Sequence, residues 1–404
     1  MLESKKKRHT QKQLTAADIL GNPDYLAISY GGYRHKTRDI QPTVSELKDD
    51  MKLLSAMGIK ILRTYNVQLQ QASNLLKAIS ELKQEDSSFE MYVMLGAWID
   101  CKNAWTDMMP NHEVESEQNA GEIDRAVALA KQYPDIVKII AVGNEAMVHW
   151  ATSYFVRPTV ILKWVNHLQE LKKSGELPND LWITSSDDFS SWGGDSNYHN
   201  EDLNNLIRSV DYISMHTYPM HNSHYNPDFW MVPEEDVELS DKEKIESAMQ
   251  RALLFCQNQY DSVVNYMRSL GINKPVHIGE TGWATISNEH YGADGSKAAD
   301  EYKSGKYYQL VREWTNTEEI SCFYFEAFDE PWKDAENPLG SENHFGLINL
   351  KGEAKYGIWD SVDKGVFKGL TRDGMSITKT YNGKEEDLLE DVHVPPRKEE
   401  TVNY

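Results

Sequence analysis

The chain has 404 residues, of which 40% are hydrophobic and 26% charged, a composition typical of a globular protein with a large core rather than of a disordered one. No run of residues approaches the roughly 20 consecutive apolar positions of a membrane span, so no such span is predicted. The formal net charge of −21 repels phosphate backbones and argues against nucleic acid as a partner. It suits a neutral or cationic small molecule or polymer, and equally a surface that is charged for solubility alone.

Eight short apolar segments recur along the chain, each followed by a polar loop and then by an amphipathic stretch. They occupy residues 25–33, 59–66, 89–99, 137–145, 181–187, 210–219, 274–283 and 320–330. Two of the intervening stretches open with a capping box, Thr43 with Glu46 and Ser240 with Glu243, before apolar residues at helical spacing. Strands that alternate with helices indicate a parallel sheet, and eight such units predict an α/β protein folded as a (β/α)8 TIM barrel.

The loops after several predicted strands are enlarged, and they lie on the C-terminal face, where a barrel builds its active site. The longest cover residues 100–121, 187–203, 220–240 and 284–305. We expect a single catalytic barrel over residues 24–381. Residues 1–23 are predicted to be a flexible polar N-terminal tail, and residues 382–404 a charged C-terminal tail.

Polar side chains stand where the predicted strands end, and in a barrel these ends converge on one cavity. Two carboxylates, Glu145 and Glu280, each follow an apolar strand without a break. Opposed carboxyl groups can cleave a glycoside, one protonating the leaving oxygen while the other attacks the anomeric carbon. Two structural roles are open as well: Glu145 at a helix N-terminus, and an ion pair between Glu280 and Arg63. The two glutamates alone do not identify a reaction.

Three motifs at these positions carry a family resemblance. The stretches VGNEAM at 142–147, IGETGWAT at 278–285 and FYFEAFDEPWK at 323–333 resemble glycoside hydrolase family 17, in their order and in their places on the fourth, seventh and eighth predicted strands. This family, of clan A, contains β-1,3-glucanases and glucanosyltransferases with a (β/α)8 barrel, and the sequence is more similar to its bacterial and fungal members than to the plant enzymes. The resemblance implies a retaining mechanism with Glu145 as general acid/base and Glu280 as nucleophile.

The resemblance also implies roles for further residues at the strand ends. Asn144 is expected to bind the sugar 2-hydroxyl, Tyr218 to contact and support the nucleophile, and Arg63 to support it electrostatically or to form a structural ion pair. Glu326 and Lys333 are expected either to bind substrate or to form a buried pair. Four aromatic residues are expected either to stack on sugar faces or to belong to the core: Tyr30, Tyr65, Trp283 and Trp332.

Neither a metal nor an organic cofactor is expected. The sequence HTYPMHNSHYNPDFW contains His216, His221 and His224, but no carboxylate stands near them in the sequence at ligand spacing, so a histidine-lined substrate wall is favoured over a metal site. The three cysteines are far apart and in no metal-ligand pattern, so buried free thiols are expected at Cys101, Cys256 and Cys322.

The sequence therefore predicts a retaining glycoside hydrolase that cleaves β-1,3-glucosidic bonds in glucans such as laminarin. The alternatives are a β-1,3-glucanosyltransferase and a catalytically inactive glycan-binding barrel. Long loops leave open whether the cleft is an endo-acting groove or a pocket for chain ends. We expect a monomer. The N-terminal stretch MLESKKKRHTQKQ lacks the apolar core of a signal peptide, so the sequence does not assign a location. Either the protein is intracellular, or a leader has been trimmed from a secreted, periplasmic or lipid-anchored protein, and a polymeric substrate outside the cell favours the second.

Overall fold

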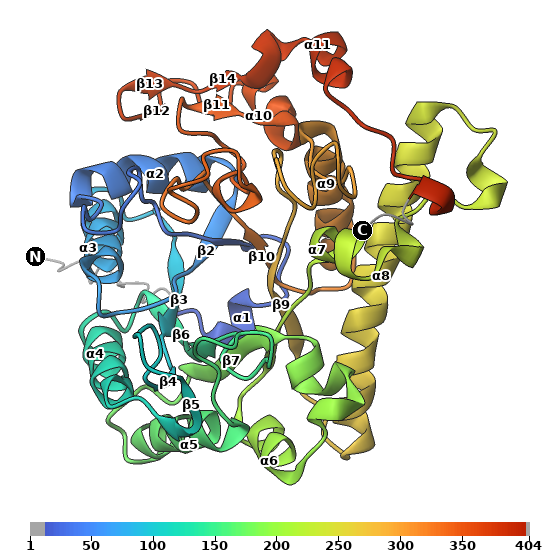
Figure 1. Cartoon of the computed structure of the whole chain (residues 1–404). Helices are drawn as coiled ribbons and strands as arrows, with labels where there is room; N and C mark the ends of the chain where they lie inside the picture. The colour runs from blue at the N-terminus through green and yellow to red at the C-terminus, as the bar shows by residue number, and fades with distance from the viewer. Residues whose placement is uncertain (1–12, 401–404) are drawn as a thin grey trace, which may run out of the picture.

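A computed structural model describes residues 13–400 of the chain, and its centre is a closed barrel of eight parallel strands (Figure 1). The order around the barrel is β1-β10-β9-β8-β7-β6-β3-β2, which confirms the predicted (β/α)8 fold. Seven of the eight predicted strand segments contain a barrel strand, and the eighth, 181–187, contains all of β7 but its last residue. Their bounds are β1 Leu26–Ser29, β2 Ile59–Arg63, β3 Tyr92–Ala97, β6 Val137–Asn144, β7 Trp182–Asp188, β8 Ile213–His216, β9 Val276–Gly282 and β10 Cys322–Phe325.

Helices surround the barrel and cover the outer face of its strands. The larger ones are α2 Val44–Ala56, α3 Gln70–Glu85, α4 Gln118–Gln132, α5 Pro158–Lys173, α6 Glu201–Ser209, α8 Asp241–Ser269 and α9 Glu301–Thr317. Both predicted capping boxes form. The hydroxyl oxygen of Thr43 or Ser240 accepts a bond from the backbone N–H of the glutamate three residues on, and the carboxylate of that glutamate accepts a bond from the backbone N–H of the capping residue. The sequence thus fixes where α2 and α8 begin.

Successive residues of a barrel strand alternate between the inside of the barrel and the helix layer. In β2, Ile61 packs inside the barrel, whereas Leu62 belongs to the core between strands and helices. The same alternation places Ala27 inside and Ile28 outside in β1. Two apolar layers therefore hold the strands, and polar residues enter only where the inner layer gives way to the mouth of the barrel.

The N-terminal segment closes the other end of the barrel, which corrects the expectation of a loose tail up to residue 23. Thr15 caps the short helix α1, Ala16–Ile19. The side chains of Ala16 and Ile19 are fully buried and pack against the inner barrel residues, among them Phe323. Residues 1–12 of the expected tail lie outside the described residues.

The C-terminal segment also packs on the barrel, which corrects the expectation of a loose charged tail from residue 382. In helix α11, Glu385–Glu390, Leu388 is fully buried. Farther on, the Nζ of Lys303 donates to the carbonyl oxygen of His393 at 2.7 Å, and Arg397 pairs with Val232 in a β-bridge. Apolar and backbone contacts thus fix a segment whose composition is mostly charged.

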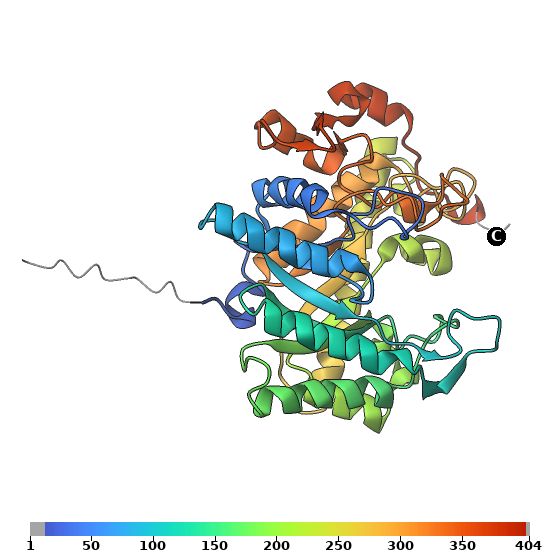
Figure 2. The same cartoon turned by 90° about the vertical axis from the view of Figure 1, so that its left-hand side faces the viewer.

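The C-terminal face carries the enlarged loops, as predicted. After β3 the chain forms the antiparallel hairpin of β4, Cys101–Lys102, and β5, Asn111–Glu115, which projects beyond α4 and α5 in Figure 2. After β8 it forms helix α7, Pro219–Tyr225. The remaining small elements include the helix α10 Trp359–Asp363 and the strands β11 Glu353–Ala354, β12 Thr371–Arg372, β13 Met375–Ser376 and β14 Thr378–Lys379.

Two further expectations concern the cysteines and the membrane. Cys101, Cys256 and Cys322 are buried free thiols, as predicted. Among the helices of residues 13–400, none is both long enough and apolar enough to cross a membrane.

A buried charge network ties the two ends of the barrel sequence together. The carboxylate of Asp50 on α2 is fully buried and accepts hydrogen bonds from Tyr30 at 2.8 Å, from Arg34 at 2.9 Å and from Arg372 on β12 at 3.0 Å. Loss of one partner from such a network leaves the opposite charge buried without compensation, which is strongly destabilising.

We therefore expect Asp50→Ala to lower the free energy of unfolding by about 3–5 kcal/mol. Urea unfolding followed by circular dichroism measures the change. Asp49→Ala is the matched control: Asp49 is 40% exposed and lies 3.8 Å from Lys52, so its loss is expected to cost under about 1 kcal/mol. Equal midpoints for the two variants would contradict the role given to Asp50.

Candidate active site

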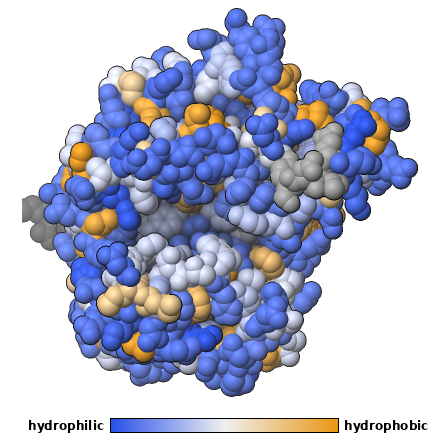
Figure 3. Space-filling model, in the orientation of Figure 1, coloured by the Kyte–Doolittle hydropathy of each residue, from blue (hydrophilic) through white to orange (hydrophobic). Residues whose placement is uncertain are grey.

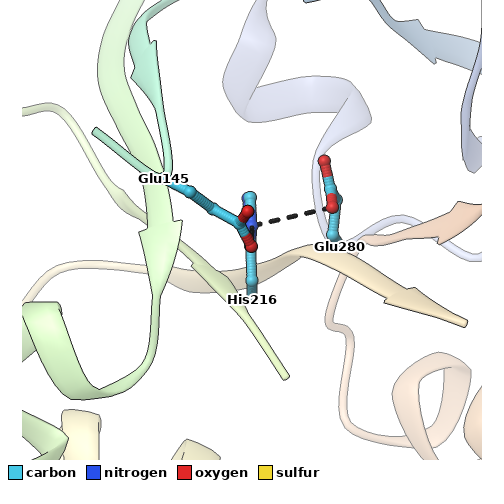
Figure 4. A group of neighbouring side chains, drawn as sticks. All are labelled: Glu145, His216 and Glu280. Atoms are coloured by element: carbon cyan, nitrogen blue, oxygen red, sulfur yellow. Dashed lines mark hydrogen bonds and ion pairs between the residues drawn. The ribbon is translucent and has the colours of Figure 1, made fainter. Parts of the chain in front are cut away.

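The C-terminal end of the barrel brings three titratable side chains together from three strands (Figure 4). Glu145 directly follows β6, Glu280 lies on β9, and His216 ends β8 between them. The Nδ1 atom of His216 lies 3.0 Å from Oε1 of Glu145 and 3.7 Å from Oε2 of Glu280. One donor atom from each of the three lies within 4.8 Å of the others. The pair of glutamates predicted from the sequence therefore forms one site.

The local backbone explains why glycine and a strained glutamate follow such an apolar strand. Gly143 has a φ of 82°, and a Cβ there would lie 2.9 Å from the Cβ of Ala146. Glu145 itself has a φ of 45°, a conformation that non-glycine residues adopt at a cost. Its N–H donates to the carbonyl of Ser186 at 3.0 Å, and the N–H of Met147 donates to Asp187 at 2.7 Å. The neighbouring strand β7 thus holds the glutamate at the cavity.

The carboxyl group of Glu280 is held in its ionised form. Burial raises its pKa, but His216, the guanidinium of Arg63 and a hydrogen bond from Tyr218 outweigh burial and lower the pKa to about 2. Arg63 donates to Oε1 of Glu280, and the Tyr218 hydroxyl donates to Oε2 at 2.7 Å. An ionised carboxylate at the end of a barrel strand is suited to nucleophilic attack.

The carboxyl group of Glu145 is held in the opposite state. Burial raises its pKa well above the usual value, and the negative charge of Glu280 raises it further. The side chain keeps 16% of its surface exposed, so it can reach a ligand in the cavity. A protonated carboxyl group at this place is suited to donate a proton.

His216 is a neutral link between the two glutamates. Burial lowers its pKa to about 4, so the ring is uncharged near neutral pH. Its Nε2 lies 2.8 Å from the hydroxyl of Ser186, which lies 2.8 Å from that of Ser214. When Glu145 is protonated and donates to Nδ1, the tautomer that satisfies these partners carries its hydrogen on Nε2. The ring thereby fixes the direction in which the Glu145 carboxyl group points.

The same three side chains have the donor types of a metal site, and the sequence had not suggested this because the carboxylates are distant from His216 along the chain. The fully buried guanidinium of Arg63, however, already binds Glu280 and would repel a cation placed between the glutamates. The Nδ1 atom of His216 is also engaged with Glu145. The charges around the cluster therefore fit a proton-transfer pair better than a metal site.

Arg63 also orients the predicted sugar-binding amide. Its second terminal nitrogen donates to Oδ1 of Asn144, and its first also donates to the carbonyl of Gly279 at 3.1 Å. Because the Asn144 oxygen is occupied, its amide N–H groups remain the part available to a ligand. Tyr65 is half-buried, and its ring lies 4.7 Å from the guanidinium carbon of Arg63. Both residues therefore lie in the wall around Glu280.

The residues after β10 form a second charged cluster beside this wall. The Nζ of Lys333 lies 3.2 Å from Glu326, 3.9 Å from Glu330 and 3.8 Å from the ring centre of Phe325. Burial raises the pKa of Glu326 well above its usual range, although Lys333 opposes the shift. The Oε1 atom of Glu326 is buried and has no hydrogen-bond partner among the residues the structure describes. The predicted pair is present, and one of its oxygens is left for another partner.

Trp332 is half-buried near this cluster. Its indole N–H donates to Oε2 of Glu330 at 3.0 Å, the guanidinium of Arg38 lies 4.2 Å from its ring centre, and Tyr33 packs edge-on at 5.9 Å. Of the four aromatic residues considered for sugar stacking, Trp332 and Tyr65 thus keep partial exposure.

The other two aromatic residues belong to the core. Tyr30 lies in the strand-to-helix layer, is 1% exposed and donates to Asp50. Trp283 is fully buried, donates to the carbonyl of Ala298 at 2.8 Å, and packs against Trp230 and Tyr307. Neither ring is available to stack on a sugar, so the core alternative holds for both. The residue missed by sequence reasoning is His216 as the partner of Glu145, since only a metal or wall role was considered for it.

The face of the molecule seen in Figure 1 is hollowed near its middle. Figure 3 shows a hollow across the middle of the same face as in Figure 1, with near-neutral and hydrophilic atoms along its edges. An extended hollow lined by polar groups can admit a polar chain rather than one small apolar ligand.

The comparisons with known proteins agree with this geometry. Residues 27–346 match the BtgE/BtgC glycoside hydrolase domain. The crystal structure of an endo-laminarinase from Formosa Hel1_33_131 is 67% identical, with a TM-score of 0.95 over 97% of this chain and 100% of that chain. An active-site mutant of the Rhizomucor miehei β-1,3-glucanosyltransferase in complex with laminaritriose is 23% identical, with a TM-score of 0.56 over 83% of this chain and 96% of that one, a likeness of fold.

A curated relative is more distant. The putative glucan endo-1,3-beta-glucosidase btgC of Aspergillus niger is 24% identical over 328 residues, which are 78% of this chain and 40% of that protein. The chain thus spans about two fifths of the length of that relative. Since the domain match covers most of the barrel together with both glutamates, the chain belongs to the family of BtgE/BtgC glycoside hydrolase domains.

Proposed function

We propose that the protein is a retaining endo-β-1,3-glucanase that acts on laminarin-type glucans. One observation carries the retaining mechanism: Glu145 and Glu280 face each other with donor atoms within 4.8 Å and with opposite protonation states. Retaining glycosidases hold their two carboxyl groups about 5–5.5 Å apart, whereas inverting ones need about 6.5–9.5 Å. The 67% identity with an endo-laminarinase over the whole of that chain supports the substrate class and the endo action.

In the first step, Glu280 attacks the anomeric carbon while Glu145 donates its proton to the glycosidic oxygen. The glycosidic bond breaks, the leaving chain departs with a new hydroxyl group, and the glycosyl unit becomes an ester of Glu280. Arg63 and Tyr218 keep Glu280 ionised until the attack, because both stabilise its negative charge. The amide of Asn144 is placed beside this reacting centre by Arg63.

In the second step, the same residues act in reverse. The ester has no charge, so the electrostatic contribution of Glu280 to the raised pKa of Glu145 disappears, and Glu145 becomes a competent base. It takes a proton from water, the oxygen attacks the anomeric carbon, and Glu280 leaves as a carboxylate. A sugar hydroxyl in place of water would give transfer, which products longer than the starting oligosaccharide would reveal.

The first prediction concerns the nucleophile. Glu280→Ala is expected to lower laminarin hydrolysis by on the order of 10⁴-fold or more, because no ester can form. With an activated aryl β-laminaribioside, azide is expected to restore turnover and give the α-glycosyl azide, since a single displacement inverts the centre. Nuclear magnetic resonance of the product reads the configuration.

Glu145→Ala is the matched counterpart. Its first step on the activated aryl substrate needs no proton donor, so azide is expected to react with the enzyme ester and give the β-glycosyl azide. The same anomer from both variants, or no loss of laminarin hydrolysis in either, would refute the assigned roles.

The second prediction concerns pH. Tyr218→Phe removes one hydrogen bond that lowers the pKa of Glu280, so that pKa rises from about 2. Because Glu280 must be ionised, activity is lost as pH falls through its pKa, and the acidic limb of the kcat/KM profile is expected to move to higher pH.

Profiles of kcat/KM from about pH 2 to about pH 9 measure this shift, because the acidic limb of the wild type lies at the lower end of that range and that of the variant is expected above it. The matched control is Tyr225→Phe, because Tyr225 ends the helix α7 that Tyr218 precedes and is 65% exposed. An acidic limb that stays in place in Tyr218→Phe, or moves equally in the control, would show that Tyr218 does not set the pKa of Glu280.

A further inference from the structure

Three aromatic rings pack together on the loops beside Glu145. We define the aromatic platform as Trp98, Trp105 and Tyr154. Trp105 stacks on Tyr154, with ring centres 5.1 Å apart and planes 24° apart. Trp98 lies 5.1 Å from Tyr154 and 6.2 Å from Trp105. The three rings come from two loops, one after β3 that contains the β4–β5 hairpin and one after β6.

The platform is held in place by the loops that carry it. The indole N–H of Trp98 donates to Asp100 at 3.2 Å, and the N–H of Cys101 donates to the carbonyl of Tyr154 at 3.0 Å. A second link joins the two loops, because His112 stacks on Phe155 with ring centres 3.7 Å apart. The rings are therefore positioned before any ligand binds, which lowers the entropic cost of binding.

One face of the platform is open. Tyr154 is 9% exposed, whereas Trp105 is 63% exposed. Tyr154 covers one side of the Trp105 ring, so the exposed area belongs mainly to its other side and edges. A single exposed apolar side chain needs no explanation, but a flat indole that is preset by stacking is a surface of the kind that sugar rings pack against.

The platform adjoins the reacting centre on the side of the acid. Tyr154 lies nine residues after Glu145, in the loop that follows β6. This loop folds back toward the strand end, because the N–H of Val156 donates to the carbonyl of Ala146 at 2.7 Å. Burial raises the pKa of Tyr154, and of the two glutamates Glu145 contributes more to this shift than Glu280. Glu145 is the residue that protonates the leaving oxygen, so its side of the cleft faces the leaving chain.

We propose that the aromatic platform binds glucose units of the leaving-group portion of a β-1,3-glucan chain. This inference rests on the proposed function and deepens it, because it says where that substrate lies relative to the cleaved bond. Equatorial hydroxyl groups leave C–H surfaces on the two faces of a β-linked glucose, and these pack on Trp105. Binding there holds the glycosidic oxygen near Glu145, and binding energy remote from the bond can lower the barrier to its cleavage.

The test compares two substrates with Trp105→Ala. Laminarihexaose can place glucose units on both sides of the cleaved bond, whereas 2,4-dinitrophenyl β-laminaribioside has no glucose unit in its leaving group. We expect kcat/KM for laminarihexaose to fall about tenfold. The value for the aryl substrate is expected to change by less than about twofold, and Trp105→Phe, which keeps a flat ring, is expected to recover most of the loss.

The matched control is Trp150→Ala. Trp150 is 60% exposed on the same loop as Tyr154, and among the described residues its ring stacks on none of the platform rings. Its loss is expected to leave both substrates unchanged. Thermal unfolding of each variant shows whether the fold is kept.

Three outcomes would overturn the proposal: no loss on laminarihexaose in Trp105→Ala, an equal loss on both substrates, or an equal loss in the Trp150 control. The activity of the wild type tests the proposed function independently of the variants. If the wild type hydrolyses neither laminarihexaose nor laminarin, that function fails whatever the variants do. Binding of laminarihexaose to Glu280→Ala, with and without Trp105→Ala, then tests the platform without turnover: equal affinities refute it.

Discussion

The neighbouring carboxyl groups of Glu145 and Glu280, with donor atoms within 4.8 Å, are kept in opposite protonation states. The chemistry of the site depends on this difference. Burial acts on both in the same direction, toward the neutral acid. Arg63 and Tyr218 reverse the effect at Glu280, while the resulting negative charge reinforces it at Glu145. The ionisation of one group therefore maintains the proton on the other. His216 joins them as a neutral ring near neutral pH, and it gains the positive charge that lowers the pKa of Glu280 only as the pH falls toward about 4.

The strand ends were the part of the site that the sequence could predict. An apolar run followed at once by Asn144 and Glu145 predicts a polar group at the barrel mouth, and the structure places it there beside Glu280. The sequence could not decide between the core and the cavity for Tyr30 and Trp283. Tyr30 follows β1 on the side of the helix layer and Trp283 leaves β9 into the core, and which face a residue takes after a strand ends depends on loop geometry that composition does not reveal.

The chain ends show a second limit of sequence reasoning. Residues near the N-terminus are polar on average, yet Ala16 and Ile19 fit the open end of the barrel, because a few apolar side chains suffice to fill it. Near the C-terminus, one fully buried leucine, Leu388, anchors a charged helix. Average composition predicts solvation of such segments, whereas their position is decided by single contacts with a surface formed by distant residues.

The pairing of Asp50 with Arg372 bears on how the protein is made. The two residues are 322 positions apart, so a ribosome that has just completed α2 has yet to synthesise almost the whole barrel before Arg372 appears. At roughly 5–20 residues per second this takes on the order of 16–65 s. Throughout that time Asp50 on α2 can pair with Tyr30 and Arg34, but its third partner, Arg372, has not been made. The charge network around Asp50 is thereby completed only after the last barrel strand, β10, has been made.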